Sequence, residues 1–262
     1  MQTSKEKHKK GALSMDKKMI GTFFELGSTQ AVEGLAQTGL DYIIIDTEHN
    51  CYAPETVSDF IRAAENNGLL PYVRIGDIRR PYVLQMADIG ARGLIIPNIR
   101  SVDEVKTIVS YAKFAPVGQR GYCPTRTSGW GHAAWAGTVD GYMAECNHRL
   151  KVIPQCETKE ALDVIEDIVA LDGVDGIFVG PCDLSIALGI PLQFDSPVLE
   201  EAIERILKAC QSAGKESIIF TGSTADSRKW LAKGFDSVAQ GLDVMTLINA
   251  YADVVTTVKK SR

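Results

Sequence analysis

The chain alternates between short runs of apolar, β-branched residues and longer amphipathic segments. The apolar runs predict strands, and residues 43–45 (Ile-Ile-Ile) and 94–96 (Leu-Ile-Ile) are typical of them. Eight such runs occur, at residues 19–26, 41–46, 69–75, 93–97, 151–155, 174–179, 216–221 and 235–240. Segments with helical periodicity lie between them, at 56–66, 101–113, 159–170, 198–213, 224–233 and 244–259.

The predicted strands are nearly continuous apolar runs, which is typical of a parallel sheet covered on both faces. Several predicted helices end at a glycine just before the next strand, as at Gly68, Gly90 and Gly214. Eight strand–helix units in about 240 residues predict a single-domain α/β fold, the (β/α)₈ TIM barrel. An open doubly wound sheet fits less well, because residues 26–29 (Leu-Gly-Ser-Thr) lack a Gly-rich phosphate turn.

Composition and charge narrow the classes of function. The 262 residues are 45% hydrophobic and 23% charged, and no apolar run reaches the roughly 18 residues of a membrane helix. Residues 1–18 carry six lysines, and the remaining chain has 22 basic and 31 acidic residues. We interpret 1–18 as a solvated, partly disordered tail, with a basic address or anchor as the alternative. The acidic body disfavours a nucleic-acid partner.

The six cysteines form no C-x-x-C pair, and the basic amino-terminal run lacks the apolar stretch of a secretion signal. Free thiols and a cytoplasmic location are therefore expected. Residues 114–150 form a Gly-rich insertion between a predicted helix and the next strand, and a loop of this length is usually functional. Its polar residues Arg120, Arg126 and Ser128 would suit an acidic small molecule, although a solvated turn is the alternative.

Polar residues stand where several predicted strands end, which is where barrel enzymes place their active sites. They are Asp46, His49, Arg74, Glu157 and Asp183. Glu157 and Asp183 follow consecutive strands, so a closed barrel brings the two carboxylates together, and these need a proton or a metal between them. Two oxygen ligands without His or Cys favour Mg²⁺ or Mn²⁺ over Zn²⁺.

Each of these residues also has an ordinary structural interpretation. Asp183 could simply cap the short helix after it, and Glu157 could lie in an exposed helical turn. His49 could be a loop histidine, or Asp46 three residues earlier could orient its imidazole as a general base. Arg74 interrupts an apolar run, so it is either a salt-bridged barrel residue or part of an anion site.

Five segments of the chain match a known family in order and spacing. They are 41–49 (ending Asp-Thr-Glu-His), 90–97, 118–121 (Gly-Gln-Arg-Gly), 154–158 (Pro-Gln-Cys-Glu-Thr) and 173–185 (containing Gly-Pro-Cys-Asp). Together they resemble the metal-dependent class II 2-oxo-acid aldolases, which are typified by 4-hydroxy-2-oxoheptanedioate aldolase and the 2-keto-3-deoxy sugar-acid aldolases. The resemblance extends from about residue 19 to residue 250.

This resemblance implies a (β/α)₈ barrel in a homohexamer, with the last helix exchanged between subunits. It implies reversible cleavage of a 4-hydroxy-2-oxo acid to pyruvate and an aldehyde, through a pyruvate enolate. Glu157 and Asp183 match the ligands of a divalent metal, Mg²⁺ or Mn²⁺, with Co²⁺ as a third option. Gln155 matches a polar residue beside that metal.

The resemblance also assigns the remaining roles. Arg74 matches the arginine that binds the donor and steadies its enolate. His49, together with Asp46, matches the pair that handles the proton. The backbone N–H groups of Cys182 and Asp183 would hold the pyruvate carboxylate at the start of a helix. We further expect Arg120, Arg126 and Ser128 of the insertion to contact the aldehyde.

Two other functions stay open on the sequence. The first is an acyl-thioester lyase of the citryl or malyl type, which shares the acidic metal pair but needs a larger basic entrance for its nucleotide. The second is a non-catalytic, ligand-binding barrel, which the intact set of polar strand-end residues disfavours. No lysine stands at a strand end in a place that suggests a Schiff base, so a covalent class I mechanism is also disfavoured.

Overall fold

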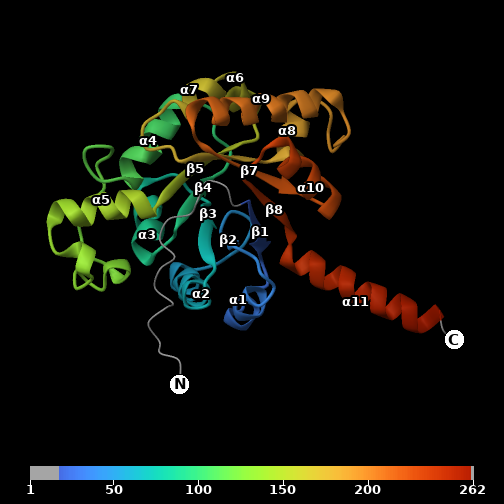
Figure 1. The fold of residues 1–262 in the computed structure, drawn as a ribbon, viewed down its shortest axis with the longest axis horizontal. Coiled ribbons are helices and arrows are strands. Elements are labelled where there is room, and N and C mark those ends of the chain that lie inside the picture. The colour runs from blue at the N-terminus through green and yellow to red at the C-terminus, as the bar shows by residue number, and fades with distance from the viewer. Residues whose placement is uncertain (1–17, 261–262) are drawn as a thin grey trace.

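Eight parallel strands close into a barrel in the computed structural model, which describes residues 18–260 (Figure 1). The strands are β1 (Met19–Phe24), β2 (Tyr42–Asp46), β3 (Leu70–Arg74), β4 (Gly93–Ile96), β5 (Lys151–Cys156), β6 (Gly176–Val179), β7 (Glu216–Thr221) and β8 (Ser237–Leu242). Each strand pairs with the next, and β8 pairs with β1. The predicted (β/α)₈ barrel is therefore confirmed.

Helices cover the outside of this barrel. They are α1 (Thr29–Ala36), α2 (Pro54–Asn66), α3 (Arg80–Ile89), α4 (Val102–Ala112), α5 (Val139–Arg149), α6 (Lys159–Asp163), α7 (Ile165–Val169), α8 (Pro181–Ala187), α9 (Pro197–Ala213) and α10 (Thr224–Lys233), with 3₁₀ turns η1 (Arg126–Ser128) and η2 (Ala134–Ala136). The last helix, α11 (Asp243–Lys260), is not part of this outer layer. The segment predicted as one helix over 159–170 is two, because the backbone of Val164 leaves the helical region.

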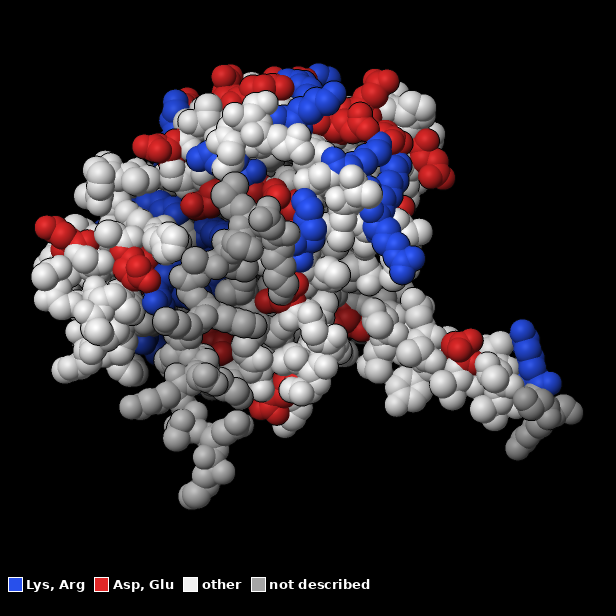
Figure 2. All heavy atoms as spheres, viewed as in Figure 1, with Lys and Arg blue, Asp and Glu red and all other residues white. Residues whose placement is uncertain are grey.

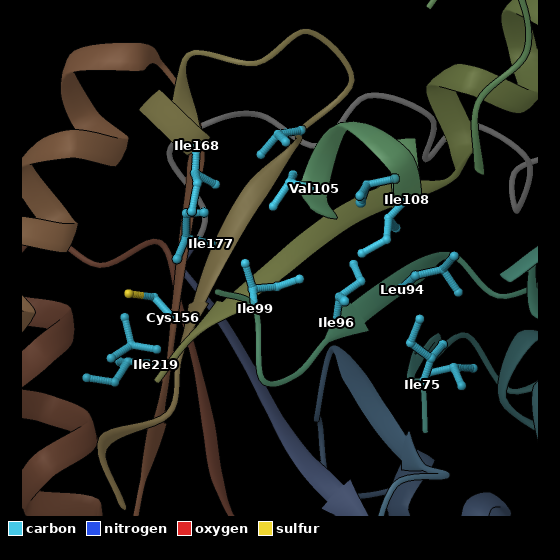
Figure 3. Packing of buried hydrophobic residues seen from close by; sticks show 14 of the residues in the cluster. Ile75, Leu94, Ile96, Ile99, Val105, Ile108, Cys156, Ile168, Ile177 and Ile219 are labelled. Atoms are coloured by element: carbon cyan, nitrogen blue, oxygen red, sulfur yellow. The ribbon is translucent and has the colours of Figure 1, made fainter. Parts of the chain in front are cut away.

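Successive residues of each strand belong alternately to two apolar layers, one inside the barrel and one outside it. Tyr42 and Ile44 point into the barrel, where they pack with residues of the other strands, whereas Ile43 and Ile45 point outward against the helices. Figure 3 shows the outer layer, in which Ile96 and Ile177 of the strands lie near Ile108 and Ile168 of the helices. Most strand residues on both faces are buried, which accounts for the continuous apolar runs in the sequence.

The last helix differs from the others. In Figure 1, α11 projects away from the barrel, and Asp243 at its first position is its only buried residue. Figure 2 shows the helix as largely uncharged along its length. Among residues 18–260, no helix is long and apolar enough to cross a membrane. The basic tail predicted at 1–18 lies outside the described residues, apart from Lys18.

Candidate active site

Arg74 forms a buried ion pair with Asp46 at the ends of β3 and β2. The strand register places the two residues side by side. The Nε and Nη2 atoms of Arg74 donate to the two oxygens of Asp46 at 2.9 and 2.7 Å, and Nη1 lies 3.3 Å from Oε2 of Glu48. Although burial lowers the pKa of Arg74, the bonds to Asp46 and the charge of Glu48 outweigh it and raise this pKa overall.

The guanidinium of Arg74 also lies over the ring of Phe23, with 4.6 Å from Cζ to the ring centroid. Two N–H groups of Arg74 donate to Asp46, so other N–H groups of Arg74 remain for a ligand. Arg74 is thus a salt-bridged barrel residue, as one of the two sequence interpretations held. It also lines a cavity at the strand ends, and its role in an anion site stays a prediction.

His49 lies at the same end of the barrel but is not held by Asp46 as expected. The Asp46 carboxylate accepts hydrogen bonds from Arg74 and from the backbone N–H of Glu48. The Nε2 atom of His49 lies 3.8 Å from Oε2 of Glu48, and its side chain is 67% exposed. The register of β2 against β3 decides this, since it places Arg74, and not the later loop residue, opposite Asp46.

Glu157 and Gln155 lie two strands around the barrel from Arg74: Gln155 is near the end of β5, and Glu157 directly follows this strand. Glu157 accepts hydrogen bonds from the backbone N–H of Asn98, at 2.7 Å, and from the side-chain amide of Gln155. Burial raises the pKa of Glu157, and the charges of Asp183 and Glu48 raise it further. The amide oxygen of Gln155 is buried without a hydrogen-bond partner in the described structure.

Gly180 allows this arrangement. A Cβ atom there would lie 2.8 Å from Oε2 of Glu157 and 2.9 Å from Nε2 of Gln155. The next residue, Pro181, begins α8 without an N–H group, and the N–H groups of Cys182 and Asp183 follow. Burial raises the pKa of the Cys182 thiol, which makes it a weak nucleophile.

These residues fit a hard divalent cation. Within residues 18–260 no group of three or more His, Cys, Asp and Glu side chains forms a complete metal cage. Glu157 and Asp183 supply two carboxylates, and the unpartnered amide oxygen of Gln155 is a further oxygen donor beside them. Such a set suits a cation that keeps several waters, and a bound cation would offset the repulsion between the carboxylates.

Two cavities meet at these residues. The smaller, of about 190 Å³, lies inside the barrel mouth, and its lining includes Arg74 and Gln155. The larger, of about 660 Å³, is lined by Glu48, Glu157 and rim residues, and the two share His49 and Asp183. A groove of about 860 Å³ between α7 and α9 is larger, but it is distant from the strand ends and lined mainly by surface charges.

The insertion residues lie elsewhere. Arg120 pairs with Asp88 at 2.6 Å, and Arg126 pairs with Glu65 at 2.7 Å. Ser128 is buried and donates to the carbonyl of Thr125. Asp88 and Glu65 lie in the last turns of α3 and α2, and in a barrel the helices end beside the amino-terminal ends of the strands.

Arg120, Arg126 and Ser128 thus attach the insertion to the opposite end of the barrel within this chain. Each of the three residues makes a polar contact within the described fold, and the expectation that they contact the aldehyde stays a prediction. The sequence-based reasoning also omitted Glu25 and Glu48, which line the cavities. The available signal was their position, one residue after the end of β1 and two residues after the end of β2.

Known proteins resemble this chain over most of its length. Residues 19–250 match the family model described as HpcH/HpaI aldolase/citrate lyase. A 2-keto-3-deoxy-L-rhamnonate aldolase of Klebsiella pneumoniae is 34% identical over 88% of this chain and 85% of its own. A family protein of Burkholderia cenocepacia has a TM-score of 0.85 at 32% identity, covering 93% and 95% of the two chains. A citrate synthase has a TM-score of 0.84 at 27% identity, covering 94% of each.

The family model covers nearly all of the described barrel, and the relatives align over most of both chains. The chain therefore belongs to the HpcH/HpaI aldolase/citrate lyase family and is a carbon–carbon lyase.

Proposed function

We propose that this enzyme cleaves a 4-hydroxy-2-oxo acid reversibly to pyruvate and an aldehyde, with the help of a divalent metal. One observation carries the proposal. A guanidinium held by buried Asp46 and an oxygen-donor group of Glu157 and Gln155 lie at the same end of the barrel, and the guanidinium and the Gln155 amide line one cavity. Both features supply positive charge, or the means to bind it, where a carbonyl oxygen becomes an enolate.

The metal would be held by Glu157 and Asp183, with the Gln155 amide beside them, and Mg²⁺, Mn²⁺ or Co²⁺ would suit these ligands. When bound, it supplies Lewis-acid polarisation of the carbonyl oxygen. The protein's own contribution to the same oxygen is Arg74, whose side chain lines the cavity. Because Asp46 already holds this guanidinium in place, little reorganisation is needed during the reaction.

His49 is the proposed proton acceptor and donor. It belongs to the lining of both cavities, so its imidazole can reach a substrate that extends between them. Imidazole suits proton transfer near neutral pH, and the Nε2 atom of His49 lies 3.8 Å from the Glu48 carboxylate. Asp46 contributes indirectly, because it holds Arg74 in place.

The donor carboxylate would lie at the start of α8, where the N–H groups of Cys182 and Asp183 are available. Phe23, Phe178 and Phe220 line the same small cavity and limit the access of water to it. These apolar walls strengthen every charged contact within the cavity.

We also propose that α11 packs against another copy of this chain in a hexamer. Ile248, Tyr251, Val255 and Val258 recur at helical spacing and are each about half exposed or more. An apolar face of this length is normally covered by a partner. The described cysteines are all unpaired, which supports a cytoplasmic location.

The decisive experiment follows the methyl protons of pyruvate by NMR in deuterated water. With Mg²⁺, Mn²⁺ or Co²⁺ present, the enzyme should exchange these protons for deuterium, and addition of an aldehyde should yield the 4-hydroxy-2-oxo acid. A chelator should stop the exchange without changing the circular dichroism of the barrel, and Mn²⁺ should restore it. Cleavage of a citryl thioester without any exchange of free pyruvate would contradict the proposal.

A further inference from the structure

Glu25 is a carboxylate of the active-site cavity to which the proposed mechanism gives no role. It follows β1 directly, is partly buried, and lines the smaller cavity together with His49, Arg74 and Asp183. Its side chain makes no hydrogen bond or ion pair within residues 18–260. Burial raises the pKa of Glu25, and the charges of Asp46 and Asp243 raise it further.

The backbone at Glu25 is held on both sides. Its N–H donates to Asp243 at 2.9 Å, the N–H of Leu26 donates to the same buried carboxylate at 3.3 Å, and its carbonyl accepts from the hydroxyl of Tyr52 at 2.7 Å. These bonds end β1 at Phe24 and fix the point from which the side chain extends. The carboxylate is thus positioned by the backbone and left free for a ligand.

The charges around Glu25 are of both signs, and the guanidinium among them is already paired with carboxylates. Asp46 and Asp243 oppose its ionisation, while Arg74 and His49 favour it. Arg74 is already committed to two carboxylates, Asp46 and Glu48. The neighbouring walls of the cavity are apolar, with Phe220 and Leu242 among them. A second carboxylate placed there would be repelled, whereas a hydroxyl group would find an acceptor.

The position of Glu25 in the barrel separates it from the donor site. β1 lies four strands around the closed barrel from β5, which carries Gln155, so the two residues face each other across the mouth. Pyruvate would occupy the side of Gln155 and the start of α8. The side of Glu25 is therefore left for the aldehyde.

We propose that Glu25 is a specificity-determining residue that accepts a hydrogen bond from a hydroxyl group of the aldehyde and rejects aldehydes that carry a carboxylate. This inference rests on the proposed aldolase function and adds the class of acceptor, a neutral hydroxyaldehyde. It differs from the expectation based on Arg120 and Arg126, which favoured acidic compounds and relied on charges that the fold neutralises.

Two variants test separately the hydrogen bond to the hydroxyl group and the repulsion of a carboxylate. Glu25→Ala removes the acceptor, and the preference for a hydroxyaldehyde over its deoxy analogue should fall by about 10- to 100-fold. Glu25→Gln keeps an acceptor oxygen and nearly the same size but loses the charge. It should keep most of the hydroxyl preference and improve the use of an anionic aldehyde by roughly 10-fold. Glu33→Gln, an exposed change on α1, is the matched control.

The experiment measures kcat/KM for addition of pyruvate to two matched pairs of aldehydes at saturating Mn²⁺. The pairs are 2-hydroxypropanal with propanal, and 4-oxobutanoate with butanal. Wild-type enzyme should prefer 2-hydroxypropanal over propanal, and butanal over 4-oxobutanoate. Proton exchange of pyruvate, measured in every variant, reports the donor half of the reaction separately.

The outcomes distinguish the inference from the function on which it rests. If both Glu25 variants exchange pyruvate protons and keep the wild-type preferences, Glu25 does not select the aldehyde and the inference is overturned alone. A wild-type preference for 4-oxobutanoate over butanal would also overturn it. If wild-type enzyme exchanges no protons with any of the three metals, the proposed function fails, and this inference fails with it.

Discussion

Replacement of Arg74 by lysine tests whether the planar fork of the guanidinium is required. In the structure this group makes two hydrogen bonds to Asp46, contacts Glu48 and lies over the ring of Phe23. An ammonium group retains the charge, but it cannot hold both oxygens of Asp46 in one plane and also point a donor into the cavity.

The expected loss of stability in Arg74→Lys follows from these contacts. Loss of one charge-assisted hydrogen bond costs about 1.5–3 kcal/mol, and loss of the contact with the Phe23 ring costs about 0.5–1 kcal/mol. The pair is nearly buried, with 12% of the Arg74 side chain and none of Asp46 exposed, so solvent screens it little. Arg74→Lys should therefore lower the free energy of unfolding by about 2–4 kcal/mol, or Tm by roughly 5–15 °C.

The reaction rate should also fall, by a free energy comparable to the loss of stability. If Arg74 donates to the enolate oxygen, its loss should slow the reaction by about 10²–10³-fold. Both pyruvate proton exchange and oxaloacetate decarboxylation form this enolate, so both rates should fall together. The assays are NMR exchange, release of CO₂ at saturating Mn²⁺, and thermal unfolding followed by circular dichroism.

Arg205→Lys is the control, because Arg205 binds Glu166 in the same two-point geometry at the protein surface. An exposed pair of this kind contributes about 0–1 kcal/mol, so this variant should resemble wild-type. An Arg74→Lys enzyme that retains half of its activity would refute the argument for the fork. A loss of exchange with normal decarboxylation would show that Arg74 acts on the proton and not on the enolate oxygen.

Three further predictions follow from the site and the last helix. His49→Ala should slow proton exchange by about 10²–10⁴-fold and oxaloacetate decarboxylation much less; equal losses would assign His49 to binding. Gly180→Ala, whose Cβ would lie 2.8 Å from a Glu157 oxygen, should raise the Mn²⁺ concentration for half-maximal exchange by about 10-fold or more; an unchanged titration would separate Glu157 from the metal. Tyr251→Asp together with Val255→Asp should lower the mass measured by light scattering while the barrel stays folded, and an unchanged mass would exclude this face as an interface.

The sequence alone determined the architecture of this protein. Strands buried on both faces must be apolar throughout, and the runs at 43–45 and 94–96 therefore predicted a covered parallel sheet before any contact was known. It also predicted the end of the barrel at which Arg74, Gln155 and Glu157 gather, because residues at the ends of parallel strands share one edge.

Only the tertiary structure decided which of these residues hold one another. The partner of Asp46 is Arg74, 28 positions away, because the register between β2 and β3 aligns them, and local spacing had pointed to His49. Arg120 and Arg126 are similar cases, since their carboxylate partners lie on helices formed earlier in the chain. The periodicity of apolar residues along the sequence indicates which face of an element is buried. It does not indicate the strand register or the side-chain pairing between distant segments.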